Sequence, residues 1–256
     1  MKKYAFIALA FALAVAGSAR AQAIKTADHA GLDKILTKIF GNNNSFTADM
    51  VTTETVHDES TTIPGKIASS PGAIRTELDL GNGTSPRMKP ENTARLKTMG
   101  LDQTVEIRRF DKNISYFLYP NLSAYVETPL QNADAKPDTA FKVKITELGK
   151  ETIDSHPCIK NKVVVTDDQG NNYESTVWNA TDLKLFPLKI EIASAARTST
   201  YALSNVKMGK PDATLFEVPA NYKKYASQQS VTFEQMKKQM GSNALHVTSA
   251  PPTNHP

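Results

Sequence analysis

The chain has 256 residues, among which 30 lysines and arginines against 26 aspartates and glutamates give a formal net charge of +4. Because these charges are scattered rather than gathered into one stripe, the sequence argues against a nucleic-acid partner. The length suffices for one domain with a well-buried core, and the single cysteine, Cys158, excludes an intramolecular disulfide.

The N-terminus has the pattern of a cleavable export signal. Two lysines at positions 2 and 3 precede an apolar run over residues 4–17. Ala19-Arg20-Ala21 then supplies the small residues that signal peptidase requires. The run is too short for a stable membrane span, and Gln22, the first residue after the cut, is not the cysteine that lipidation would need. We therefore expect a soluble protein that is released into the periplasm of a bacterium with two membranes.

A helix is expected near the start of the mature chain. Asp28 is a suitable N-cap, and Gly41 followed by three asparagines ends the pattern. Apolar residues recur between them at helical spacing: Leu32, Ile35, Leu36, Ile39 and Phe40. This apolar stripe must pack against the segments that follow.

From Ser45 onward the spacing changes to the two-residue alternation of β-strands. Phe46, Ala48 and Met50 alternate with polar or β-branched neighbours in the first such segment. Further strands are expected over residues 63–69, 73–80, 105–109, 114–119, 123–128, 141–147, 159–166, 173–179, 186–192 and 198–205, and a short helix over 91–99. Tight turns join the strands and no helix interrupts the second half, which predicts an antiparallel meander.

The C-terminal residues are expected to form a short helix and a tail outside the main domain. The helix is predicted over residues 232–240, and the Pro/Ser/Thr-rich residues 243–256 are expected to be disordered. The apolar residues and two adjacent lysines of this helix would also suit a membrane surface, but nine residues are few for that, so docking on the domain or fraying is favoured. The chain thus divides into a signal (1–21), a domain (22–225) and this C-terminal part (226–256).

Three stretches in order resemble one family. The first contains Ile107-Arg108-Arg109-Phe110 and Tyr116-Phe117-Leu118-Tyr119-Pro120, and the second contains Gly149-Lys150-Glu151 and Leu185-Phe186-Pro187. The third runs from Leu203-Ser204-Asn205 to Phe216-Glu217-Val218-Pro219. Together with the signal peptide, this order makes residues 28–225 resemble the LolA-like group of periplasmic lipoprotein carriers and outer-membrane lipoprotein-sorting proteins.

The resemblance implies a mainly β fold with flanking helices, namely an incomplete antiparallel β-barrel that is lidded by α-helices and encloses an apolar cavity for acyl chains. We expect strand residues on one alternating register to line the cavity and the N-terminal helix to supply the lid. The candidate ligand-binding residues are Leu32, Ile35, Leu36, Ile39, Phe46, Ala48, Met50, Tyr116 and Leu118. The alternative, in which the same residues pack into a closed core without a cavity, stays open.

One position departs from the family pattern. The best-known carriers of the family have an arginine immediately before the proline of the turn between the second and third strands, where it latches the lid. Here Ser70 precedes Pro71, and the nearest arginine is Arg75. The cargo is therefore open between a lipoprotein, another lipid and no lipid at all.

Other site chemistries find little support. His156 and Cys158 are close in sequence, but Pro157 between them points to a turn, and a metal site would need further ligands at fixed spacing. We expect Cys158 to be buried, with a mixed disulfide to a thiol oxidoreductase or a nucleophilic role as alternatives. The sequence contains no Gly-x-Ser-x-Gly motif and no glycine-rich phosphate loop.

The sequence thus predicts a non-enzymatic protein, without cofactor or metal, that binds acyl chains and shuttles them towards the outer membrane. Its expected partners are an acylated lipoprotein or lipid, an inner-membrane donor protein and an outer-membrane acceptor protein, with the carrier itself a monomer. The alternative is a sensor or interaction domain of the same fold, which recognises envelope lipoproteins and signals to a protein partner.

Overall fold

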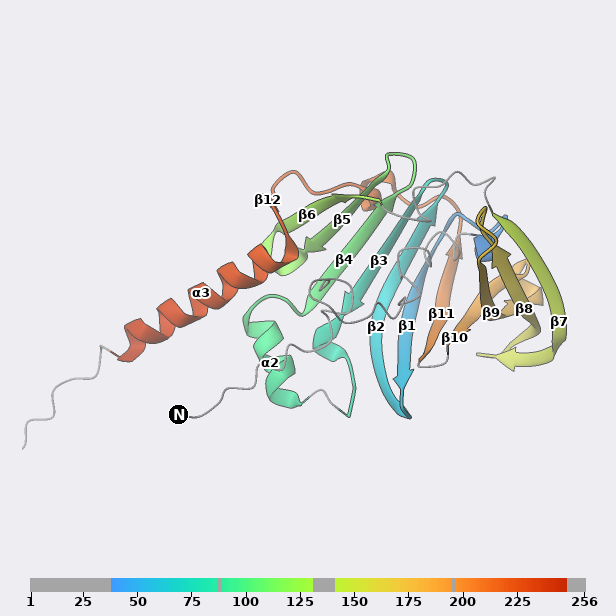
Figure 1. The fold of residues 1–256 in the computed structure, drawn as a ribbon, viewed down its shortest axis with the longest axis horizontal. Coiled ribbons are helices and arrows are strands. Elements are labelled where there is room, and N and C mark those ends of the chain that lie inside the picture. Colours follow the sequence, from blue (N-terminus) through green and yellow to red (C-terminus); the bar gives the residue numbers. More distant parts are fainter. Residues whose placement is uncertain (1–37, 87–88, 131–140, 195–196, 248–256) are drawn as a thin grey trace, which may run out of the picture.

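The computed structural model describes residues 38–86, 89–130, 141–194 and 197–247, with residues 240–247 as backbone only. Its dominant element is one 12-stranded sheet in the order β12-β6-β5-β4-β3-β2-β1-β11-β10-β9-β8-β7 (Figure 1). The strands are β1 (Phe46–Val56), β2 (Glu59–Ser70), β3 (Ala73–Asp79), β4 (Gln103–Arg109), β5 (Ile114–Tyr119), β6 (Ala124–Pro129), β7 (Lys142–Ile153), β8 (His156–Thr166), β9 (Asn172–Ala180), β10 (Phe186–Ala193), β11 (Thr198–Met208) and β12 (Lys223–Tyr225).

Two antiparallel meanders make up this sheet. One consists of β1 to β6 and the other of β7 to β11, and they join where β1 pairs with β11, for example Met50 with Leu203. β12 pairs in parallel with β6 at the end of the first meander. The predicted antiparallel architecture is confirmed, but it is not one meander in chain order. The reason is that the β1–β11 pairing joins segments far apart in sequence, which turn signals between neighbouring strands do not encode.

The sheet curls but does not close into a barrel. Its two edges are β12 and β7, and within the described part of the chain β7 pairs only with β8. Figure 1 shows the sheet as an arch, with the helix α2 (Pro90–Thr98) lying under it. The expected incomplete antiparallel barrel with flanking helices is therefore present.

Most strands begin and end within a few residues of the predicted ranges, because turn-forming residues mark their ends. Gly72 (φ +80°) and the pair His57 and Asp58 (φ +48° and +65°) adopt left-handed backbone conformations between strands. β7 extends to Ile153, well past its predicted end. β12 was not predicted, since its three residues carry no recognisable alternation.

The pairing register assigns each residue of the first meander to one face of the sheet, because directly opposed residues of neighbouring strands point to the same side. Phe46 is opposite Ser69, and Ser69 is opposite Ile74. Ile74 is opposite Arg108, which in turn is opposite Ser115. We call the side that carries these residues the inner face and the other side the outer face.

Apolar side chains on the inner face form a first cluster that joins the two meanders. Phe40, Phe46 and Phe186 meet in it, with ring centroids 4.6 to 5.7 Å apart. The cluster continues through Met50 and Leu203, which lie opposite each other on β1 and β11. Burial of these aromatic and aliphatic side chains is the main term that holds the two meanders together.

A second cluster lies on the outer face of the first meander. Ala68, Val105 and Ile107 are buried there beneath the segment that connects β11 to β12. That segment contains the 3-10 turn η7 (Ala213–Phe216), and its Phe216 is buried in the cluster. The first meander is therefore apolar on both faces, unlike a simple barrel wall.

Two helices pack on the inner face near β5 and β6, where they form a third cluster. Val231 of α3 (Gln228–Val247) is fully buried and lies in this cluster with Tyr119 and Val126. Met236 of the same helix also packs against this cluster, and beyond it α3 points away from the sheet (Figure 1). The helix is longer than predicted, and residues 243–247, which were expected in the disordered tail, are helical. Among the described residues, no helix is both long and apolar enough to cross a membrane.

Candidate functional site

The inner face presents an apolar floor. Phe46, Ala48 and Met50 have exposed fractions of 0%, 6% and 4%, so these three predicted cavity residues lie on the inner face and are packed into the first cluster. Pairing from β1 through β11, β10 and β9 to β8 places Val163 and Val177 on the same face, where both are buried. The role of this floor in ligand contact stays a prediction.

The floor ends in an exposed apolar rim at the open edge of the sheet. On β7, Val143 is opposite Val165 and Ile145 is opposite Val163, which puts both β7 side chains on the inner face. Val143 is 43% exposed and Ile145 is 63% exposed, whereas their partners on β8 are buried. Large apolar side chains that continue a buried surface into solvent are typical of a binding site.

A polar strip crosses the inner face along β4. It consists of Thr104, Glu106 and Arg108, with Thr76 of β3 beside Glu106 and Ser115 of β5 beside Arg108. Nε of Arg108 donates to Oε1 of Glu106 at 2.9 Å, and the hydroxyl of Ser115 donates to the same oxygen at 3.1 Å. The side chain of Arg108 is 11% exposed and that of Glu106 is 33% exposed. Mutual pairing offsets the cost of removing these charges from water.

Tyr116 and Leu118 do not lie with the other predicted cavity residues. Both alternate with Ser115 and Phe117 and therefore point to the outer face, where they pack in the second cluster. The expectation of one shared register across β1 and β5 was wrong. Its physical reason is that the segment connecting β11 to β12, which we call the crossover segment, supplies a second apolar surface, so apolar residues of β4 and β5 face outward.

The predicted lid falls mostly outside the described residues. Leu32, Ile35 and Leu36 belong to that part of the chain, so their role remains a prediction. Ile39 is described, and it is partly buried against the first cluster beside Phe40. The end of the predicted helix therefore does contact the inner face.

Arg75, the arginine nearest to the family's latch position, points away from the inner face. It is opposite Ile107, an outer-face residue, and its Nε donates to Oε1 of Glu77 at 2.7 Å. Its Nη1 donates to the carbonyl oxygen of Leu215 at 3.0 Å. Arg75 therefore holds the crossover segment on the outer face, where it does not contact a lid on the inner one.

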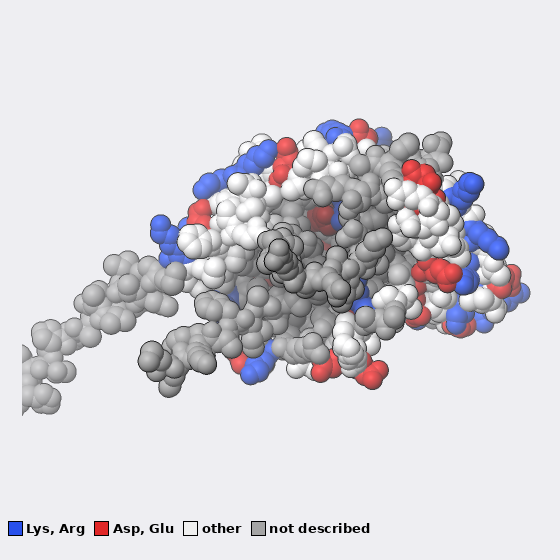
Figure 2. All heavy atoms as spheres, viewed as in Figure 1, with Lys and Arg blue, Asp and Glu red and all other residues white. Residues whose placement is uncertain are grey.

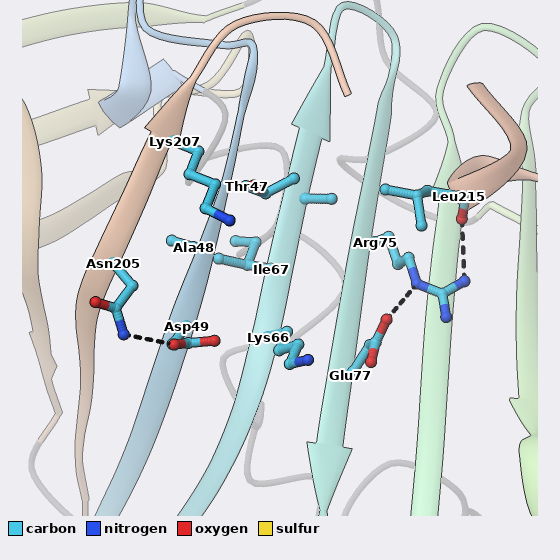
Figure 3. A pocket seen from close by; sticks show the side chains of 11 residues that line it. Thr47, Ala48, Asp49, Lys66, Ile67, Arg75, Glu77, Asn205, Lys207 and Leu215 are labelled. Atoms are coloured by element: carbon cyan, nitrogen blue, oxygen red, sulfur yellow. Dashed lines mark hydrogen bonds and ion pairs between the residues drawn. The ribbon is translucent and has the colours of Figure 1, made fainter. Parts of the chain in front are cut away.

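A groove of about 320 Å³ lies on the outer face between β11, β1, β2, β3 and η7 (Figure 3). Its walls carry two hydrogen-bonded pairs, since Arg75 binds Glu77 and the side-chain amide of Asn205 donates to Asp49 at 2.7 Å. On the side of the molecule shown in Figure 2, positive and negative side chains are interspersed along the margins of the described part. Charged side chains such as Asp49, Lys66 and Glu77 line much of this groove, so it suits an acyl chain poorly.

Cys158 is buried, as the sequence predicted, with 2% of its surface exposed. Its thiol donates to the carbonyl oxygen of His156 at 3.4 Å, and burial raises the pKa of the thiol. The ring of His156 binds Asp182 instead, at 2.7 Å from Nδ1 to Oδ2. Because the thiolate is the reactive form, this environment disfavours nucleophilic chemistry at Cys158.

The sequence does not by itself predict the polar strip, although β4 shows a clear alternation. The alternation indicates a strand that contains Val105 and Ile107, and it assigns no role to Glu106 and Arg108. The signal that could have revealed the strip is a carboxylate and a guanidinium two residues apart, which places them on one face of a strand. Which face they occupy depends on the crossover segment.

Solved structures with a similar fold include three proteins of bacterial origin. An uncharacterized conserved protein from Thermus thermophilus has a TM-score of 0.43 and 11% identity, over 77% of this chain and 99% of that one. Lipoprotein LppX of Mycobacterium tuberculosis has a TM-score of 0.39 and 12% identity, over 75% and 100%. A LolA superfamily protein from Nitrosomonas europaea has a TM-score of 0.34 and 11% identity, over 74% and 96%.

One of these three is a LolA superfamily protein, which is the family that the order of the sequence motifs resembles. At these identities the likeness concerns the fold alone. No family model and no curated protein matches the sequence.

Proposed function

We propose that the protein binds acyl chains on the inner face of its sheet and carries them through an aqueous compartment. The signal pattern over residues 1–21 favours the periplasm as that compartment, and the proposed cargo is then a lipid or acylated lipoprotein bound for the outer membrane. No catalytic group is required, because burial of apolar area drives the binding. A membrane-bound donor and an acceptor would load and unload the carrier.

The observation that carries this proposal is the apolar rim. Val143 and Ile145 lie on the inner face in line with buried valines of β8, yet they remain largely exposed at an edge where the barrel does not close. An acyl chain laid against the rim would extend the apolar floor. Each methylene that it buries contributes about 0.8 kcal/mol, so a short stretch of chain suffices for useful affinity.

The first test is native mass spectrometry of the mature protein, purified from periplasm without detergent. A stoichiometric phospholipid or acylated peptide bound to the protein would support the proposal and identify the cargo class. A protein that carries no lipid, and that takes up none on incubation with lipids, would contradict it. Recovery of a stoichiometric protein partner in place of lipid would favour the sensor alternative.

The second test places a charge on the rim. We expect Val143→Glu and Ile145→Glu to weaken binding of a fluorescent fatty acid by about tenfold each, because a carboxylate in the apolar path must be desolvated when the chain binds. Both side chains are exposed, so the fold should tolerate the change.

Val51→Glu is the matched control. Val51 is 39% exposed on β1, but its place beside Met50 puts it on the outer face. It should leave fatty-acid affinity unchanged. Equal losses in all three variants would show that the inner face has no special role.

A further inference from the structure

The inner face does more than offer apolar area, because the polar strip lies between two apolar clusters. Ile74, beside Arg108, belongs to the first cluster, and Phe117, beside Glu106, packs against the third. An acyl chain on either cluster would bring its polar end to the strip. The strip therefore lies where it would contact the polar end of a bound lipid and could favour one kind of polar end over another.

We propose that Glu106 and Arg108 determine which lipid is bound, favouring an acyl chain with an uncharged polar group that donates hydrogen bonds over one with a phosphate. This rests on the proposed function, since it presumes that the inner face binds acyl chains. The selected class is a neutral lipid such as a monoacylglycerol, whose hydroxyl groups both donate and accept.

The argument comes from the unequal exposure of the two charges. Arg108 is only 11% exposed, whereas Glu106 is 33% exposed, so a ligand that reaches the strip meets the carboxylate more readily than the guanidinium. Arg108 and Ser115 both donate to Oε1 of Glu106, and none of the side-chain hydrogen bonds found in the described residues uses Oε2. That oxygen accepts hydrogen bonds, which a hydroxyl group can supply and a fully deprotonated phosphate cannot.

Electrostatics acts in the same direction. A phosphate placed beside Oε2 of Glu106 would be repelled, because it would lie closer to the carboxylate than to the buried guanidinium that partly compensates that charge. The Arg108 charge is already compensated by Glu106 and attracts a second anion weakly. Thr76, opposite Glu106 on β3, adds a hydroxyl that suits a neutral polar group.

The chain offers a matched control for this pair. Arg75 and Glu77 form the same kind of ion pair, two residues apart on the neighbouring strand β3, with 17% and 34% of their side chains exposed. They lie on the outer face, since Glu77 is opposite Val105. A change at Glu77 therefore alters the same chemistry on the opposite side of the sheet.

The experiment measures binding of 1-monooleoylglycerol and 1-oleoyl lysophosphatidic acid to the full mature chain by displacement of a fluorescent fatty acid. These lipids share the acyl chain and differ in the phosphate. We expect the wild type to bind the monoacylglycerol about tenfold more tightly. Glu106→Gln, which removes the carboxylate that repels the phosphate, should abolish the preference, whereas Glu77→Gln should keep it.

The outcomes separate the two proposals. If the wild type binds neither lipid, the proposed function fails. If it binds both equally, or if Glu106→Gln keeps the wild-type preference, acyl binding stands and the assignment of the strip is wrong. Near-UV circular dichroism checks that Glu106→Gln is folded. Should it not fold, the uncharged double variant E106Q/R108Q replaces it and is expected to bind both lipids with equal affinity.

Discussion

At the scale of single residues, Gly65 marks the closest approach between β2 and β3. A Cβ atom at this position would lie 2.0 Å from the carbonyl oxygen of Glu77, far inside van der Waals contact. The clash is with backbone, so a side-chain movement does not relieve it. The two strands can approach this closely only because position 65 has no side chain.

We therefore predict that Gly65→Ala lowers the free energy of unfolding by about 1–3 kcal/mol, the usual cost of overpacking. Gly83→Ala is the control, since φ of Gly83 is −67° and the added Cβ would meet atoms no nearer than 3.4 Å. Urea unfolding of both variants measures the difference. A Gly65→Ala protein as stable as Gly83→Ala would mean that the strands separate there at no cost.

Individual residues also show where prediction from sequence succeeds and where it stops. Phe46, Ala48 and Met50 could be placed on one buried face because β1 alternates strictly. Tyr116 and Leu118 also alternate with their neighbours on β5, but the sequence of β5 alone does not indicate whether they lie on the inner or the outer face. Alternation shows which residues share a face of the strand. Which face is the inner one depends on the segments that pack against each face.

At the scale of elements, the crossover segment is fastened to the outer face by charges as well as by the second cluster. Nη1 of Arg109 donates to the carbonyl oxygen of Phe216 at 3.2 Å and also to Glu217. Nε of the same guanidinium donates to Asp111 at 2.9 Å. Hydrogen bonds from Arg109 hold the pKa values of Asp111 and Glu217 below their ordinary 3.8 and 4.5.

These lowered pKa values predict an acid sensitivity with a definite sign. A carboxylate with a lowered pKa in the folded state contributes stability above its unfolded pKa, and that stability is lost as the pH falls through the folded value. Loosening of the segment should therefore begin below about pH 4.5. Because Asp111 and Glu217 are about half exposed, solvent screening keeps the effect small, at less than about 1 kcal/mol.

The protection factors of the amides in residues 212–222, which are exchange rates corrected for the intrinsic dependence on pH, measure this effect at pH 6 and pH 3. Glu217→Gln should lower the protection factors at pH 6 and should reduce their further fall at pH 3. Lys189, which lies on β10 far from the segment in the sheet order, offers a control in Lys189→Gln. Wild-type protection factors that do not change with pH would mean that apolar packing alone holds the segment on the outer face.

For the molecule as a whole, the elements were more predictable than their connections. Turn residues and alternation located nearly every strand, and the family resemblance supplied the open barrel. The β1–β11 pairing, the parallel β12 and the position of the crossover depend on contacts between distant segments, for which local patterns carry no signal. The candidate site is subject to the same limit. Its polar strip lies on β4, and which face of β4 is the inner one depends on the crossover segment that covers the opposite face.

The two meanders should unfold as one unit, because the first cluster spans both. Phe46 of β1 is fully buried against Phe186 of β10, with ring centroids 4.8 Å apart. Phe46→Ala should cost about 3–5 kcal/mol through lost burial and a cavity. Trp178, the only tryptophan, lies on β9 of the second meander and reports on that half by fluorescence.

In urea unfolding, Phe46→Ala should shift the midpoint seen by Trp178 fluorescence as far as the midpoint seen by far-UV circular dichroism. Val51→Ala, an exposed change on the same strand, should shift neither. If the dichroism midpoint falls while the fluorescence midpoint stays, the meanders unfold separately and the β1–β11 junction is weak. A common shift would mean that the inner-face floor is one cooperative surface, so that a ligand bound to either half stabilises both.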